Sequence, residues 1–168
     1  MKRWWKLLAV LGVQLAILVA IPLKKVRALS WGEEVTLETV PVDPYDPLSG
    51  YYVTLAYAIE QQADVSAFAE GDEVLLVVEG STPAFRLLSA QRRVGDLRNG
   101  RVGIKARVLG GRARIDGIGR FYIPEAQRER VEGALASVGR RALVDVKVSA
   151  DGTPAILRLR AGPETFGD

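Results

Sequence analysis

Four charged residues are the side chains of this chain best suited to chemistry: Asp43, Asp46, Arg120 and Glu125. The two aspartates lie in "PVDPYDPLSG" (41–50), where prolines exclude regular strand pairing and stiffen the backbone. A rigid loop of this kind can present carboxylates that bind a cation, act as acid and base, or clamp an arginine. We expect Arg120 either to pair with one of these aspartates or to grip an anionic ligand. Together with Glu125, the set forms a candidate functional or structural cluster.

Composition excludes most of the common catalytic designs. The chain contains no cysteine and no histidine, so a Ser-His-Asp triad, a Cys-His dyad, thiol redox chemistry and a Cys or His zinc site are impossible. A serine-lysine hydrolase would have only Lys105 and Lys147 as bases after residue 28. Two aspartates three residues apart, without the other features of a calcium loop, are weak evidence for a metal site. We expect no metal and no cofactor, and we favour a non-enzymatic protein; a hydrolase using the four-residue cluster is the alternative.

The N-terminus predicts a membrane anchor over residues 1–27. Residues 7–23 carry no charge and follow the pair Trp4 and Trp5; as a helix they span about 26 Å, close to the thickness of the hydrocarbon layer. We expect the lipid bilayer to be contacted through residues 4–23. A cleaved signal peptide and a buried core helix are the other interpretations. Because the flanking basic charges are nearly balanced, the orientation is nearly a tie; we expect a single-pass protein of the cytoplasmic membrane with its folded domain outside.

Charge is segregated along the rest of the chain. Residues 28–85 contain eleven acidic and no basic side chains, whereas residues 86–160 contain seventeen basic and seven acidic ones. One interpretation is a basic face for nucleic acid or anionic lipid. The other is that acidic and basic strands pair within a sheet. Few aromatic residues separate the arginines, which often alternate with apolar residues. We therefore favour strand pairing and expect no nucleic-acid partner.

Alternation of apolar and polar residues predicts a mainly β (α+β) fold. Strands are expected at 33–40, 51–60, 72–80, 84–93, 101–110 and 112–124, followed by two strands around Asp151-Gly152. In the first strand of that last hairpin, the valines at 144, 146 and 148 face one side and Asp145 and Lys147 face the other. Pro124 opens the segment "EAQRERVEGALASVGRR", which predicts a helix. We expect one antiparallel β domain over residues 28–168 with a single helix near its C-terminal third, after one N-terminal transmembrane helix.

Two motifs resemble a known family. "GYYVTLAY" (50–57) is similar to the signature of the GDYXXLXY family, and "GIGRFYIPE" (117–125) is similar to a later motif of the same family. The family-motif positions are Gly50, Tyr51, Tyr52, Leu55, Tyr57, Tyr122 and Pro124. The resemblance implies a small bacterial membrane-anchored protein of the cell envelope without an assigned activity, and it implies a polytopic membrane protein as a possible partner.

The chain departs from the family pattern at two positions, of which the first named is the informative one. Tyr51 stands where the signature has Asp, and Ser49 stands where Arg is usual. If that Asp performed chemistry across the family, this chain could not perform it; the other interpretation is that this pair of positions is structural. The expected function is therefore that of an accessory or interaction domain working with a membrane partner.

Overall fold

The computed structural model describes residues 4, 8–18, 32–41, 52–92, 100–139 and 141–167. The strands are β1 (Glu33–Val40), β2 (Tyr52–Thr54), β3 (Ala56–Tyr57), β4 (Glu73–Glu79), β5 (Arg86–Gln91), β6 (Arg101–Leu109), β7 (Arg112–Ile115), β8 (Arg120–Tyr122), β9 (Leu143–Val148), β10 (Pro154–Ala161) and β11 (Glu164–Phe166). The helical elements are α2 (Ala58–Gln62), the 3-10 turn η1 (Glu125–Gln127) and α3 (Arg128–Ser137); residues 8–18 are helical as well.

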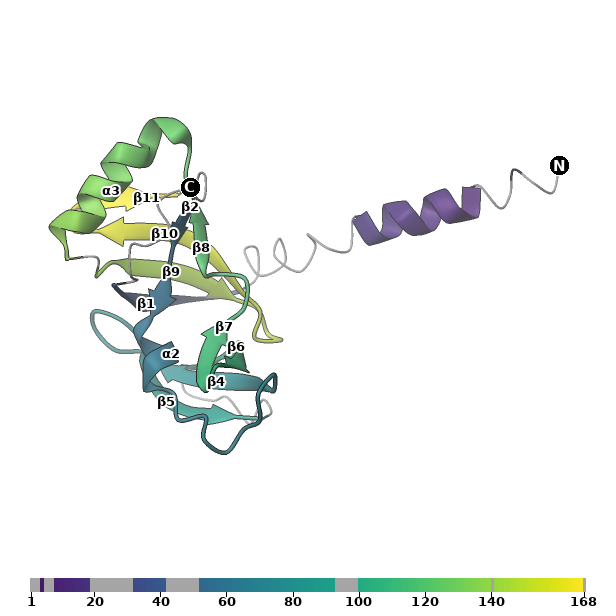
Figure 1. The fold of residues 1–168 in the computed structure, drawn as a ribbon, viewed down its shortest axis with the longest axis horizontal. Coiled ribbons are helices and arrows are strands. Elements are labelled where there is room, and N and C mark those ends of the chain that lie inside the picture. Colours follow the sequence, from purple (N-terminus) through teal and green to yellow (C-terminus); the bar gives the residue numbers. More distant parts are fainter. Residues whose placement is uncertain are drawn as a thin grey trace.

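Two antiparallel sheets and one two-stranded ribbon form the domain (Figure 1). The first sheet has the order β11-β10-β9-β1-β3, the second has the order β5-β4-β6-β7, and β2 pairs with β8 in the ribbon. The apolar faces of the sheets contribute to one buried cluster, and Val131 of α3 joins it. The predicted mainly β antiparallel fold is confirmed, and so is a helix in the C-terminal third. The expectation that this helix is the single one of the domain is wrong, because α2 is a second.

The predicted strand 51–60 is wrong in its second half. The chain leaves the extended form after Tyr57 and turns into α2. The cause is local, because the Glu60 side chain turns back and accepts the backbone N–H of Tyr57 at 3.0 Å, as a capping residue does. The predicted strand 112–124 is also interrupted, by a loop at 116–119 between β7 and β8. The short strand β11 was not expected from the sequence.

Acidic and basic strands pair within the sheets, as the charge pattern predicted. On the second sheet, Glu79 of β4 accepts a hydrogen bond from Arg86 of β5 at 2.7 Å and one from Arg101 of β6 at 3.4 Å. On the first sheet, Glu34 of β1 pairs with Arg158 of β10 at 2.7 Å. Much of the charge segregation along the sequence is therefore neutralised by ion pairs between strands of the same sheet.

Asp145 is buried, although it lies on the face of β9 opposite the core valines. Its side chain is only 1% exposed, because the neighbouring strands supply three donors to it. Arg158 donates at 2.5 Å, Arg160 at 2.6 Å and Thr36 at 2.7 Å. Burial alone would raise the pKa of Asp145, but the hydrogen bonds from these three side chains outweigh it and hold the pKa below its ordinary value. The network fastens β1, β9 and β10 together on the face opposite the core.

The predicted membrane-spanning helix falls partly outside the described residues. Within the described ranges, no helix has both the length and the apolar character needed to cross a membrane. Residues 8–18 are helical, and the large apolar side chains of that helix are exposed, as is Trp4.

Replacing Asp145 by Asn tests the β9 network. We expect the substitution to lower the free energy of unfolding at pH 7 by about 2–3 kcal/mol, less than for a fully enclosed ion pair because both arginines reach water. Because the pKa of Asp145 is lower in the folded state, its charge stabilises the fold at pH values above the unfolded pKa of about 4. This stabilisation is lost as the pH falls through the folded pKa. The gap between wild type and variant should therefore narrow below about pH 5 in urea titrations followed by circular dichroism.

Asp116→Asn is the matched control, because Asp116 forms an exposed ion pair with Arg107 at 3.3 Å. It should change the unfolding free energy by less than about 1 kcal/mol. A pH-independent gap for Asp145→Asn would show that the carboxylate charge is not what stabilises the network.

Candidate functional site

The β2–β8 ribbon brings the two sequence motifs together. Tyr52 pairs with Tyr122, Val53 with Phe121, and Thr54 with Arg120, all in antiparallel register. The segments 50–57 and 117–125, which are remote in sequence, are therefore neighbours in the fold, although residues 50 and 51 lie outside the described ones.

Strand alternation divides the ribbon into an inner and an outer face. Phe121 is buried, and Val53 packs against the core from the inner face. On the outer face lie Tyr52, Thr54, Arg120 and Tyr122, because paired residues of neighbouring strands point to the same side. We call these four residues the outer face of the ribbon. Tyr122 is 69% exposed, unusual for so large an aromatic side chain.

Aromatic and cationic groups stack on the outer face. The ring centroids of Tyr52 and Tyr122 lie 5.7 Å apart, and the rings are tilted against each other. The guanidinium carbon of Arg120 lies 4.8 Å from the centroid of the Tyr52 ring, in a cation–π contact. Among the described residues, no carboxylate pairs with Arg120; Asp43 and Asp46 are outside them.

A second set of contacts fixes the ribbon to the domain. Beyond β2, Leu55 donates its backbone N–H to the carbonyl of Gly119 at 2.9 Å. The buried Tyr57 hydroxyl donates to the carbonyl of Ile118 at 2.8 Å. Glu60 accepts the backbone N–H of Ile115 at 2.7 Å. Segment 55–60 is thus bonded along segment 115–119, and we call this contact the motif clasp.

Glu60 is enclosed by the motif clasp and only 7% exposed. Burial raises the pKa of Glu60, while the hydrogen bonds from Ile115 and Tyr57 and the charge of Arg114 at 3.9 Å oppose that rise. Burial also raises the pKa of the Tyr57 hydroxyl, and the charge of Glu60 adds to the effect. Both groups are bonded to backbone inside the fold, so their role is structural.

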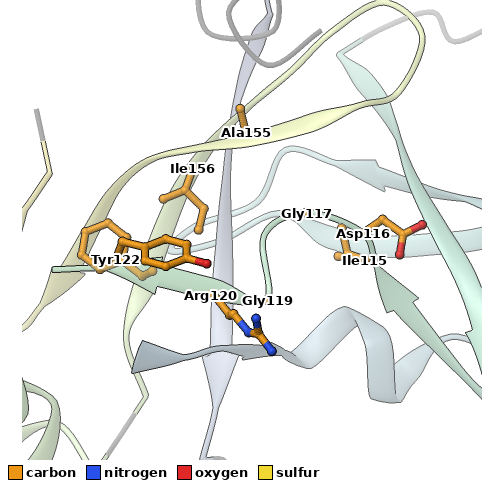
Figure 2. Close-up of a pocket in the computed structure, with 9 residues that line it drawn as sticks. Ile115, Asp116, Gly117, Gly119, Arg120, Tyr122, Ala155 and Ile156 are labelled. Carbon is orange, nitrogen blue, oxygen red and sulfur yellow. The ribbon is translucent and has the colours of Figure 1, made fainter. Parts of the chain in front are cut away.

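A cavity of about 580 Å³ lies beside β8. It is bounded by the β7–β8 loop, by β8 and by the first part of β10 (Figure 2). Its lining residues are Ile115, Asp116, Gly117, Gly119, Arg120, Phe121, Tyr122, Ala155 and Ile156. Figure 2 shows the side chain of Ile156 reaching from β10 toward the ring of Tyr122. The cavity is within the size range of ligand sites in proteins and has one exposed cation in its wall.

Two of the four residues in the predicted functional cluster lie among the described residues. Arg120 lies on β8 and Glu125 begins η1; both are exposed, and no hydrogen bond or ion pair joins them. Asp43 and Asp46 lie outside the described residues, so the clamp between loop and sheet stays a prediction. Among the described residues, no group of three or more acidic side chains is arranged to hold a metal ion.

The motif positions separate into two roles. Leu55 and Tyr57 are buried and belong to the motif clasp, whereas Tyr52 and Tyr122 form the outer face. Pro124 precedes η1 at its N-cap; Gly50 and Tyr51 lie outside the described residues. The sequence reading missed Glu60, although an acidic residue three positions after Tyr57 is a capping signal that pointed to it.

Comparison with known proteins agrees with the motifs. The family model described as "GDYXXLXY protein" matches residues 14–159, a range that includes both motifs and the whole ribbon. No curated protein and no solved structure matches the chain significantly.

Replacing Tyr57 by Phe tests the motif clasp. The substitution removes one hydroxyl and leaves the buried carbonyl of Ile118 without its donor. We expect a loss of about 1–3 kcal/mol in the free energy of unfolding, measured by urea denaturation. The matched control is Tyr122→Phe, whose hydroxyl belongs to an exposed side chain and whose loss should cost less than about 0.5 kcal/mol. Equal effects of the two substitutions would contradict a special role for the Tyr57 hydroxyl.

Proposed function

This chain belongs to the GDYXXLXY protein family, and we propose that it is a membrane-anchored, non-enzymatic accessory protein whose β domain binds a partner through the outer face of the ribbon. One observation carries the proposal. The two family motifs pair with each other and present Tyr52, Tyr122 and Arg120 together on the surface. Tyrosine and arginine are the side chains that most often anchor protein–protein contacts.

Binding accounts for the surface better than catalysis does. The buried carboxylate of Glu60 accepts hydrogen bonds from two backbone N–H groups inside the fold. Arg120 is stacked on Tyr52, which fixes a cation at the surface without directing it at a neighbouring nucleophile. An exposed aromatic pair beside a fixed cation can recognise a surface that is apolar in part and carries an anionic group.

The N-terminal helix supports the anchor. Residues 8–18 form a helix that exposes large apolar side chains, and they lie within the uncharged run 7–23. Apolar surface of this kind needs an apolar environment, and lipid is the one that the flanking tryptophans favour. We propose a location in the cytoplasmic membrane, with a single span and the β domain on the extracytoplasmic side. The family resemblance adds a polytopic membrane protein as the kind of partner that we propose.

Membrane attachment is testable on the full-length chain. We expect the protein to stay with vesicles after washing in alkaline carbonate, because about 17 uncharged residues are buried in lipid. The control is Ile17→Arg, which adds a charge to the run at a cost of about 2.5–3.5 kcal/mol and should increase the released fraction. Complete release of the unaltered chain by carbonate would contradict the anchor.

Contact through the outer face is testable by photocrosslinking in native membranes. A photoreactive amino acid in place of Tyr122 should capture a membrane protein in one discrete adduct. The control places the same amino acid at Leu109, an exposed apolar residue at the far end of β6, where no such adduct is expected. The proposal fails if both positions give the same products or if position 122 gives none.

A further inference from the structure

We propose that the outward edge of β8 is a strand-addition site that binds an extended peptide segment of the partner. The segment would pair with the backbone of Arg120 and Tyr122 and place a carboxylate side chain against the Arg120 guanidinium. This inference rests on the proposed function and specifies how the partner is held.

The hydrogen-bond register of the ribbon leaves that edge open. Leu55 donates to Gly119 directly across from it, so this pair is a hydrogen-bonded one. In an antiparallel ladder such pairs alternate with non-bonded ones. Phe121 therefore directs its N–H and C=O at β2, while Arg120 and Tyr122 direct theirs away from it. Among the described residues, no backbone or side-chain group takes up these outward donors and acceptors.

The neighbouring edge strand β7 is treated differently. The N–H of Ile115 donates to the Glu60 carboxylate at 2.7 Å, so a side chain from α2 blocks that position. Natural sheets usually protect their edges in ways of this kind, because an open edge invites pairing with another chain. β8 follows β7 after a loop of four residues, yet its outward groups have no described partner. In contrast to β7, β8 therefore has an edge whose backbone groups are available among the described residues.

The cavity provides space beside the open edge. It lies between β8 and the first residues of β10, with Ala155 and Ile156 on its far wall (Figure 2). β11 pairs with β10 only from Leu159 to Ala161, so the start of β10 is not covered by that strand. An inserted segment would lie along β8, with apolar side chains from Ile115 and Ile156 beside it.

Charge decides the chemistry of the occupant. The cavity wall carries two charged side chains, Asp116 and Arg120. Asp116 is paired with Arg107 at 3.3 Å, whereas Arg120 has one face on the Tyr52 ring and no described carboxylate partner. A carboxylate is the group that a guanidinium binds best, through two parallel hydrogen bonds. Because residues opposite each other share a face, an acidic residue would lie opposite Arg120 and an apolar one opposite Phe121.

Hydrogen exchange of the full-length chain in detergent micelles tests the site. The probe is a blocked pentapeptide, acetyl-Val-Asp-Val-Thr-Val-amide. At saturation we expect the amides of Arg120 and Tyr122 to exchange at least about tenfold more slowly, as new ladder hydrogen bonds protect them. Matched control peptides carry Asn in place of Asp, or N-methyl groups on the backbone. The Asn peptide should bind about tenfold more weakly and the N-methylated peptide should give no protection.

Variants separate the contribution of the Arg120 charge to peptide binding from the contribution of backbone pairing. Arg120→Ala should weaken the Asp peptide about tenfold and leave the Asn peptide unchanged. The control Arg112→Ala alters an exposed arginine on β7 and should change neither affinity. If Arg120→Ala lowers the melting temperature, strand addition is still tested by comparing the protection that the N-methylated and unmethylated peptides give on the unaltered chain.

Three results would overturn the proposal. The first is unchanged exchange at Arg120 and Tyr122 with the Asp peptide at millimolar concentration. The second is equal binding of the N-methylated peptide. The third is protection of these amides that appears without peptide and increases with protein concentration, which would assign the edge to a second copy of the chain. An adduct from position 122 without peptide-dependent protection would preserve the proposed function and reject only this mode of binding.

Discussion

The motif clasp is the constraint on which the arrangement of this domain depends. The segment that leaves β2 is bonded to the β7–β8 loop through the amide of Leu55 and the hydroxyl of Tyr57, and to the end of β7 through the carboxylate of Glu60. β7 belongs to the second sheet and β3 to the first. The clasp therefore joins the two sheets and also sets the register of the ribbon. Without it, neither the stacking of Arg120 on Tyr52 nor the direction of the β8 edge would be determined.

Two acidic side chains are buried among the described residues, and the domain uses them in opposite ways. Asp145 is surrounded by arginine and threonine side chains, which hold its pKa low and stabilise its charged form. Glu60 is bonded mainly to backbone amides, and burial raises its pKa. Since desolvation opposes the charge of Glu60, the residue contributes less to stability at neutral pH than its hydrogen bonds alone indicate. Its larger contribution is specificity, because it ends a strand, starts α2 and occupies the edge of β7.

Most strands could be predicted from the sequence, but the side-chain contacts between them could not. Alternation located β1, β4 and β6 closely, and the charge blocks correctly indicated pairing of acidic with basic strands. The outward direction of Arg120 and Tyr122 also follows from alternation. The stacking of Tyr52 on Arg120 does not follow from alternation, because only the register of β2 on β8 in the folded ribbon brings the two residues together. The burial of Asp145 was missed for the same reason, since its arginines lie on the next strand.

The treatment of the sheet edges links fold and function. A long open edge is a hazard, but β8 has only three residues, so it offers few hydrogen bonds to a chance encounter. Such an edge gains useful affinity only when side chains add to the backbone pairing. The outer face supplies that addition through two tyrosines and a stacked arginine. Tethering to a bilayer would further raise the local concentration of a membrane partner, so a short and individually weak edge can suffice. In the proposed mode of binding, the combination of tether, edge and cation would select the partner, rather than any one of them.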